Sequence, residues 1–441
     1  MEGLFIFLYL GEASYRLIEA IVCGIIITLA HLADHDLALS RLTIETVIEI
    51  LFHADALPRT QDDSPTGLHD MLYAINAIMD WCLRKLLVLV GVIARVENRI
   101  MSRNHEVTNT QPLLDDRGNL REPGWSRSLV QKYDRTTIKA PKWRIKEWDY
   151  YLVLSDAFAG AFTISDDGYI GLQSVSLLTF GEQPWEHTET VLNAFPMGKI
   201  GLPSDSSIGP TQYSDKRLQM KFDVGEGFRT ISCNFENFCD GKPFSCEIRL
   251  EQPDMDTMVI ATPWDKDKHF YYNQKINCMR ASGWMEFDSK RYEFNPSTDF
   301  GTLDWGRGVW TYDNTWHWGS GNADIGGNSF GFNIGYGFGN TKAASENVIF
   351  YNGKAHKLDD IEFHIPPDSY MKPWKFTSSD GRFEMDFVPV LDRAACLDYK
   401  LIVSDQHQVF GRLSGKAILD DGQVIEVKDI MCFAEKVHNR Y

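Results

Sequence analysis

The stretch LQMKFDV, residues 218–224, decides the class of fold. Its apolar and polar residues alternate at every position: Leu218, Met220, Phe222 and Val224 against Gln219, Lys221 and Asp223. A repeat of two is that of a β-strand with one face buried and the other in water. The stretch therefore predicts a strand of an antiparallel sheet.

The same alternation recurs on both sides of this stretch, in FSCEIRLE at residues 244–251 and in FEMDF at residues 383–387. Turn dipeptides punctuate this part of the chain: Asp167-Gly168, Asp240-Gly241, Asn352-Gly353, Asp380-Gly381 and Asp421-Gly422. Many short strands joined by glycine-containing turns are typical of sandwiches and barrels. The sequence therefore predicts a mainly β protein.

The β part of the chain is too long for one simple barrel, so we expect two consecutive antiparallel β-barrel or sandwich domains. The first is expected over residues 141–265 and the second over 266–441, with the boundary near Pro263. Residues 102–123 are polar and contain Asn, Asp, Gly and Pro, and we expect a linker and lead-in over residues 101–140.

Residues 1–100 have a different pattern, with apolar residues such as Leu17, Ile21 and Ile25 at helical spacing. We predict a helical N-terminal segment. Two hypotheses stay open: either Met101 is the native start and the segment comes from an over-long gene assignment, or the segment is an appendage that docks on the barrel or on a membrane surface. The apolar run at residues 20–33 is short for a bilayer, so a core helix is favoured over membrane contact.

The overall charge narrows the choice of partners. The chain has 44 Lys and Arg against 61 Asp and Glu, a formal net charge of -17, which disfavours nucleic acid and anionic membrane surfaces. The 8 cysteines include no CxxC pair, so we expect reduced thiols and a cytoplasmic location.

No motif in the sequence indicates a cofactor or a metal site. The chain lacks GxxxxGK[ST] and a strand–GxGxxG–helix unit, so we expect no cofactor. His31 and His35 are four residues apart on an expected helix, which places both imidazoles on one face. No third ligand and no HExxH motif accompany them, so we expect no metal site.

The segment DWGRGVWTYDNTWHWGSGNADIGGNSFGFNIGYGFG, residues 304–339, has the densest clustering of aromatic and glycine residues. Large rigid aromatic side chains with a few polar groups are typical of the wall of an apolar pocket. The alternative is a barrel core with glycines at tight corners. We favour the pocket, and the candidate ligand-binding residues are Trp305, Trp310, Trp316, Trp318 and Tyr336.

Three residues of the same segment are candidates for catalysis: Asp304, Arg307 and His317. A carboxyl group desolvated among aromatic rings has a raised pKa and can donate a proton. The alternative for Asp304 is a structural ion pair with Arg307 as its expected partner, although in a strand these two residues face opposite sides. His317 lies between two tryptophans and, in a strand, points away from both, which favours a structural role.

Several motifs resemble the family known as domain of unknown function 2804, over about residues 110–441: QPLLDDRGNLREPGW at Gln111, RIKEWDYY at Arg144, YYNQKINCMRASG at Tyr271, LDWGRGVWTYDNTWHWGSG at Leu303, and VFGRLSGKAILDDGQVIEVKD with FAEKVHNRY at the end. A more distant similarity is to the two-domain lipocalin-like proteins of the AttH and carotenoid-hydratase type. It implies two barrel-like domains and an apolar ligand such as a polyene, terpenoid or lipid. Some members of that group are enzymes that act by acid–base chemistry on alkenes, and others are carriers.

These observations support two main functions. The first is the binding, or transfer, of a lipophilic small molecule. The second is an enzyme of the hydratase, isomerase or cyclase type, with Asp304 as the acid and Trp305, Trp310 and Trp316 around a developing carbocation. A purely structural interaction module explains the clustered tryptophans less well. Binding is favoured because no complete catalytic set is visible.

Overall fold

The computed structural model describes residues 104–398 and 403–440. The chain divides into two compact units, residues 1–100 and 101–441, and every described residue belongs to the second. The expected helical segment, and His31 and His35 within it, therefore lie outside the described residues. Within the described ranges, no helix is both long enough and apolar enough to cross a membrane.

The first sheet contains 13 of the described strands. Its main path runs, in order of hydrogen bonding, through β7 (Trp185–Ala194), β6 (Ile170–Thr179), β5 (Phe158–Asp166), β4 (Ile145–Leu154), β15 (Phe300–Val309), β13 (Phe270–Phe287), β11 (Lys242–Glu251), β10 (Phe228–Cys239), β9 (Leu218–Gly225) and β8 (Thr211–Ser214). Beside this path, β13 pairs with β14 (Lys290–Phe294) and with β12 (Met258–Pro263), which in turn pairs with β2 (Gly124–Ser126).

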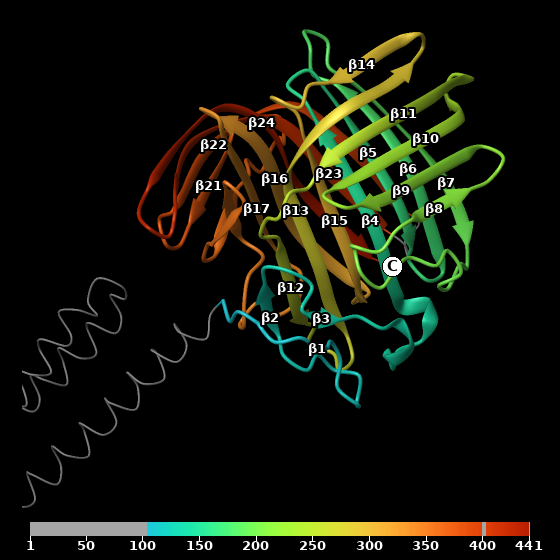
Figure 1. Ribbon diagram of the computed structural model, residues 1–441, viewed down its shortest axis with the longest axis vertical. Helices are drawn as coiled ribbons and strands as arrows, with labels where there is room; N and C mark the ends of the chain where they lie inside the picture. Colours follow the sequence, from blue (N-terminus) through green and yellow to red (C-terminus); the bar gives the residue numbers. More distant parts are fainter. Residues whose placement is uncertain (1–103, 399–402, 441) are drawn as a thin grey trace, which may run out of the picture. The chain divides into compact units, whose positions relative to one another are not determined.

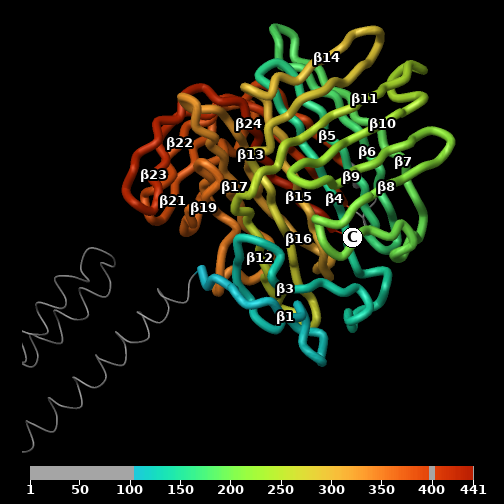
Figure 2. Tube along the Cα trace, viewed as in Figure 1, coloured from blue at the N-terminus to red at the C-terminus, as the bar shows by residue number. Residues whose placement is uncertain are grey.

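The second sheet contains 9 of the described strands, all from the C-terminal part of the chain. Their order is β19 (Lys354–Lys357), β18 (Val348–Tyr351), β17 (Asn328–Tyr336), β16 (Asp313–Ile325), β24 (Val424–Arg440), β23 (Val403–Ile418), β22 (Phe383–Asp398), β21 (Trp374–Ser378) and β20 (Ile361–His364). In Figure 2 these strands, coloured orange to red, gather beside the green and yellow strands of the first sheet.

Four short elements complete the described structure near its start. β1 (Gln111–Pro112) and β3 (Gln131–Lys132) form a small parallel pair, and two single-turn 3₁₀ helices follow at Arg135–Thr137 and Lys142–Arg144. All the pairings within the two large sheets are antiparallel, as the sequence predicted (Figure 1).

The first sheet curls until its two ends meet. Asn193 of β7 donates a hydrogen bond to the Tyr213 hydroxyl of β8 at 3.0 Å, and a ring nitrogen of His187 lies 2.8 Å from the Phe238 carbonyl oxygen of β10. The second sheet also curls toward closure. Tyr336 of β17 packs edge-on against Phe363 of β20, although these two strands are far apart in the strand order. Each sheet is thus a curled half-barrel with its own apolar interior.

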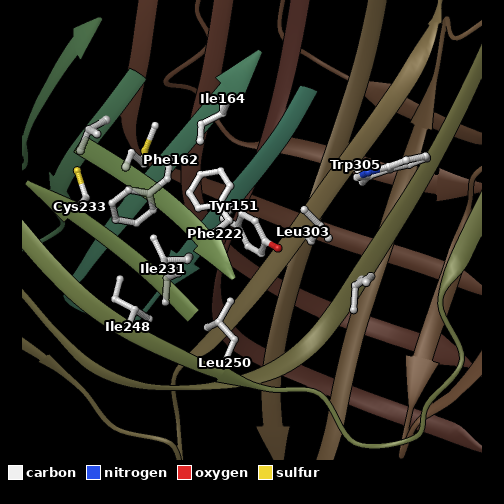
Figure 3. Packing of buried hydrophobic residues seen from close by; sticks show 14 of the residues in the cluster. Tyr151, Phe162, Ile164, Phe222, Ile231, Cys233, Ile248, Leu250, Leu303 and Trp305 are labelled. Carbon is white, nitrogen blue, oxygen red and sulfur yellow. The ribbon is translucent and has the colours of Figure 1, made fainter. Parts of the chain in front are cut away.

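The interior of the first sheet follows directly from the alternation in the sequence. Leu218, Met220 and Phe222 of β9 are buried, whereas the polar residues between them face outward. Figure 3 shows side chains from β4, β5, β9, β10, β11 and β15 pointing into this core. The Asp240-Gly241 turn joins β10 to β11, and both residues have positive φ, at 52° and 79°, the requirement of a type I′ hairpin.

A separate apolar cluster lies between the two sheets. Phe180, directly after β6 of the first sheet, stacks on Phe410 of the second sheet, with ring centroids 5.3 Å apart, and the ring centroids of Tyr150 and Trp318 are 6.1 Å apart. Trp125 joins the same cluster with only 3% of its surface exposed. The segment expected to be a linker is therefore packed against the fold, through isolated apolar residues that carry no periodic pattern.

The change of sheet falls between Val309 and Asp313, and not near residue 265 as expected from the sequence. Pro263 ends β12, and the next residues form the turn into β13, where the Trp264 amide donates to the His269 carbonyl at 3.0 Å. The proline and the polar residues around it mark a hairpin within the first sheet. β13 and β15, residues 270–309, extend this sheet and place their motifs at its centre.

Candidate binding pocket

A pocket of about 680 Å³ opens between the two sheets. Its first wall comes from β4, β5, β6, β7, β13 and β15, and its second wall from β16, β22, β23 and β24. This volume lies within the range of about 300–1,000 Å³ that small-molecule sites occupy.

The segment DWGRGVW, residues 304–310, divides its side chains between this pocket and the core. Successive residues of a strand face opposite sides. The pocket side receives Asp304 and Trp310, with Gly306 and Gly308 between them, whereas Trp305 lies in the core of the first sheet. A methyl group at Gly306 would lie 2.0 Å from a ring carbon of Trp148, its cross-strand partner. The glycine is therefore what allows the Trp148 indole to lie across β15.

The strand register arranges the first wall as one continuous row across six strands. Side chains that are opposite each other in neighbouring strands, and that all line the pocket, are Thr190, Ser174, Thr163, Tyr150, Asp304 and Lys275. The row begins with three hydroxyl groups on β7, β6 and β5 and ends with an ion pair on β15 and β13. The wall therefore changes in polarity along its length.

The second wall contains a matching row across four strands: Trp318, Glu435, Gln408 and Arg393, on β16, β24, β23 and β22. Its two ends meet the two ends of the first row. The Lys275 ammonium lies 3.8 Å from the ring centroid of Trp318, and Arg393 Nε donates to the Thr188 hydroxyl of β7 at 3.2 Å. The two rows therefore run side by side along the pocket.

Aromatic rings enclose one end of the pocket. Trp310 stands edge-on to Trp148, Tyr271 and Trp316, with ring centroids 5.5, 5.6 and 5.5 Å away. Phe338 stacks on Tyr271 at 5.0 Å. Edge-to-face packing of this kind holds each ring rigid and presents apolar faces to a bound molecule.

The carboxylate of Asp304 is bound by other side chains of the protein. Lys275 Nζ lies 2.9 Å from Asp304 Oδ1, and Asn273 Nδ2 donates to the same oxygen at 2.6 Å. The Lys275 side chain is 1% exposed and that of Asp304 is 11% exposed. Donors of this kind stabilise the charged form of a carboxyl group. Asp304 is therefore placed to balance the buried charge of Lys275.

A second carboxyl group, Glu435, lines the pocket opposite this pair. Trp316 Nε1 donates to its Oε1 at 2.9 Å, and Gln408 Nε2 donates to its Oε2 at 3.0 Å. Burial raises the pKa of Glu435 to about 7, against the lowering effect of these two hydrogen bonds. Glu435 can therefore exchange a proton near neutral pH at the surface of the pocket.

Glu346 lies behind the aromatic end of the pocket. The Tyr271 hydroxyl donates to its Oε2 at 3.4 Å, and burial raises the pKa of Glu346 to about 7, against the attraction of Lys275. One buried ammonium thus lies among three carboxyl groups, of which two hold their protons up to neutral pH. The net charge of the buried cluster is therefore close to zero.

Arg307 is part of the scaffold and not of the pocket. It is fully buried, pairs with Asp149 at 2.9 Å, donates to the carbonyl oxygens of Trp148 and Pro203, and lies over the Trp305 ring at 4.1 Å. The expected pairing with Asp304 is wrong, because the two side chains leave opposite faces of β15.

His317 and Tyr336 also lie away from the pocket. Their rings stack on each other at 4.4 Å, and both pack against Phe363 on the inner side of the second sheet. Burial lowers the pKa of His317 to about 4, so its ring is neutral at pH 7. As the sequence predicted, Trp316 and Trp318 share a face of their strand and His317 takes the other.

Sequence reasoning placed Asp304, Trp310, Trp316 and Trp318 in one segment, and the structure places these four residues in the pocket. It missed the residues that other strands contribute: Trp148, Tyr150, Tyr271, Lys275, Phe338, Arg393, Gln408 and Glu435. A signal existed for Glu435, because it occupies a buried position within an apolar run of β24. Charge at such a position indicates a paired or functional group.

Comparison with solved structures finds distant similarity over most of the chain. The crystal structure of CghA with Sch210972 is 10% identical, with a TM-score of 0.39, and the match covers 74% of this chain and 97% of that chain. Kievitone hydratase from Nectria haematococca is 9% identical, with a TM-score of 0.40 over 75% and 98% of the two chains. An AttH-type protein from Nitrosomonas europaea is 13% identical, with a TM-score of 0.34 over 68% and 93%.

No curated protein sequence matches the chain. A family model does match it, over residues 104–441, and the family is described as a domain of unknown function, DUF2804. This match spans both sheets and every residue of the pocket. The chain belongs to the DUF2804 family.

Proposed function

We propose that the protein binds a lipophilic small molecule in the pocket between its two sheets. The observation that carries this proposal is the aromatic end of the pocket, where Trp310 is surrounded by Trp148, Tyr271 and Trp316. Rigid aromatic faces around a cavity of about 680 Å³ offer a large apolar contact area at a small entropic cost.

The pocket also has the polar groups that orient a ligand. Small-molecule sites combine apolar walls with a few placed polar groups. Here the hydroxyl groups of Thr163, Ser174 and Thr190 line the wall at the end away from Lys275. A ligand with a hydrocarbon body and one polar end matches this division.

All-trans-retinol tests the proposal, because its polyene absorbs in the region where tryptophan emits. We expect retinol to quench the tryptophan emission of the full chain in a saturable titration. Trp316→Ala removes an aromatic wall and the hydrogen bond to Glu435, so we expect about tenfold weaker binding. The measurement is the dissociation constant from fluorescence.

Trp143→Ala is the matched control, because Trp143 is 47% exposed and does not line the pocket. We expect this variant to bind retinol as the unmodified protein does. Non-saturable quenching, or an equal loss of affinity in both variants, would contradict binding in the pocket.

A second candidate function is proton transfer to an alkene, and the position of Glu435 favours it. A protonated Glu435 would give its proton to one alkene carbon and leave a cation on the other, near the Trp316 ring. Loss of a neighbouring proton to the Glu435 carboxylate would complete an isomerisation. Addition of water to the cation, with transfer of the water's extra proton to the Glu435 carboxylate, would complete a hydration. Glu435 replaces Asp304 as the acid, since Asp304 is paired with Lys275.

Incubation of retinol with the protein in deuterated water separates the two candidates. If Glu435 transfers protons, deuterium enters the carbon skeleton, and Glu435→Gln abolishes this incorporation while retinol still quenches tryptophan emission. Mass spectrometry of the recovered retinol is the measurement. Equal incorporation with and without Glu435 would remove it as the acid and leave the binding function.

A further inference from the structure

Arg393 lies at the end of the pocket opposite Lys275, where the two sheets meet. Its Nε donates to the Thr188 hydroxyl of the first sheet, and its Nη1 donates to Gln408 Oε1 of the second sheet at 2.9 Å. Both partners are neutral. The guanidinium group is thus held across the pocket by acceptors that leave its positive charge unbalanced.

Arg393 belongs to none of the described ion pairs, whereas the buried side chains of Arg307 and Lys275 each belong to one. Arg307 pairs with Asp149, and Lys275 pairs with Asp304, whereas no ion pair among residues 104–398 and 403–440 includes Arg393. A half-buried guanidinium group without an anion loses hydration and gains no charge partner in return. An anion that enters the pocket would supply this partner.

We propose that Arg393 binds the anionic head of the ligand, so that the ligand is a lipophilic carboxylate. The inference rests on the proposed function, because the hydrocarbon body of the same molecule occupies the aromatic end. A guanidinium group presents parallel N–H donors that match the two oxygens of a carboxylate. Thr188 and Thr190, two residues apart on β7, add hydroxyl donors on the same face.

Of the charged side chains that line the pocket, Arg393 is the one that an anion can pair with. Those lining it are Lys146, Asp167, Glu186, Lys275, Asp304, Arg393 and Glu435. Lys146 and Asp167 attract each other, and Lys275 pairs with Asp304. The two oxygens of Glu435 accept from Trp316 and Gln408. Glu186 is half-buried on β7, and its repulsion limits how deeply an anion sits along that strand.

Retinoic acid and its methyl ester form a matched pair of probes for this site, because the ester has the same polyene body but its added methyl group removes the negative charge of the head. We expect the full chain to bind the acid about tenfold more tightly than the ester. Arg393→Gln should abolish this preference by weakening the acid about tenfold and leaving the ester unchanged. Arg393→Lys, which keeps the charge but loses the fork of donors, should give an intermediate preference.

Arg249→Gln is the control, because it removes the same charge from an exposed arginine that pairs with Glu251. It should keep the full preference, and equal melting temperatures would show that all variants are folded. Equal binding of acid and ester by the unmodified protein would overturn the anion site while the proposed function stands. Failure of retinol, acid and ester alike to bind would overturn both. A preference that survives in Arg393→Gln would assign the anion to another residue and overturn the role of Arg393.

Discussion

Lys275→Met should lower the free energy of unfolding by about 3–5 kcal/mol, because it leaves the buried Asp304 carboxylate without its cation. Methionine has a similar length and fills the same space over Trp318. Urea unfolding at pH 7 is the measurement. The double variant Lys275→Met with Asp304→Leu removes both charges and should recover much of the loss.

An exposed pair provides the control for this change. Lys242 Nζ lies 2.7 Å from Asp288 Oδ2, and the two side chains are 49% and 54% exposed, so Lys242→Met should leave the free energy of unfolding nearly unchanged. Similar costs for the two lysine variants would show that the buried pair is not needed for stability. Asp304 would then again be a candidate acid in the pocket.

Gly306→Val should abolish most retinol binding, with an affinity at least about tenfold lower, because the added side chain displaces the Trp148 indole. A Cβ at this position would lie 2.0 and 2.1 Å from two ring atoms of Trp148, and a rigid ring cannot yield locally. The indole would have to leave β15 and enter the cavity. We also expect a loss of about 1–3 kcal/mol in stability from overpacking.

Gly181→Val is the matched control, because no atom lies within 4 Å of the Cβ position at Gly181. It should bind retinol with unchanged affinity and unfold at the same urea concentration as the unmodified protein. If Gly306→Val binds retinol equally well, Trp148 does not shape the binding site. The fluorescence titration and the unfolding curve together separate a blocked pocket from a lost fold.

The fold was predictable where one residue pattern determines the structure. Alternation at residues 218–224 and 244–251 fixed strand character and the buried face, because each strand has one wet side. The dipeptide Asp240-Gly241 marked its hairpin through backbone conformations that few residues adopt. The sheet boundary was not predictable, because the pairing of β15 with β4 joins residues about 150 positions apart and leaves no local signal.

The pocket, like the fold, was predictable only where a single strand determines how its side chains point. A single strand carries its own alternation, so the opposite orientations of Trp316 and His317 followed from the sequence. The partner of Asp304 did not follow, because Lys275 reaches it through the register of two strands. The same holds for Glu435 and Arg393, which line up with Gln408 only when three long strands pair. Long-range register therefore decides which charges meet.

Photolabelling with a retinol analogue that carries a diazirine group tests the central claim, that a lipophilic molecule binds between the two sheets, most directly. After irradiation and digestion, mass spectrometry identifies the modified residues. We predict labels on pocket-lining peptides that contain Trp148, Tyr271 or Trp316, and their loss when excess retinol competes. Labels confined to exposed apolar residues such as Leu192 and Phe195, which are 62% and 61% exposed, and insensitive to competition, would contradict the claim.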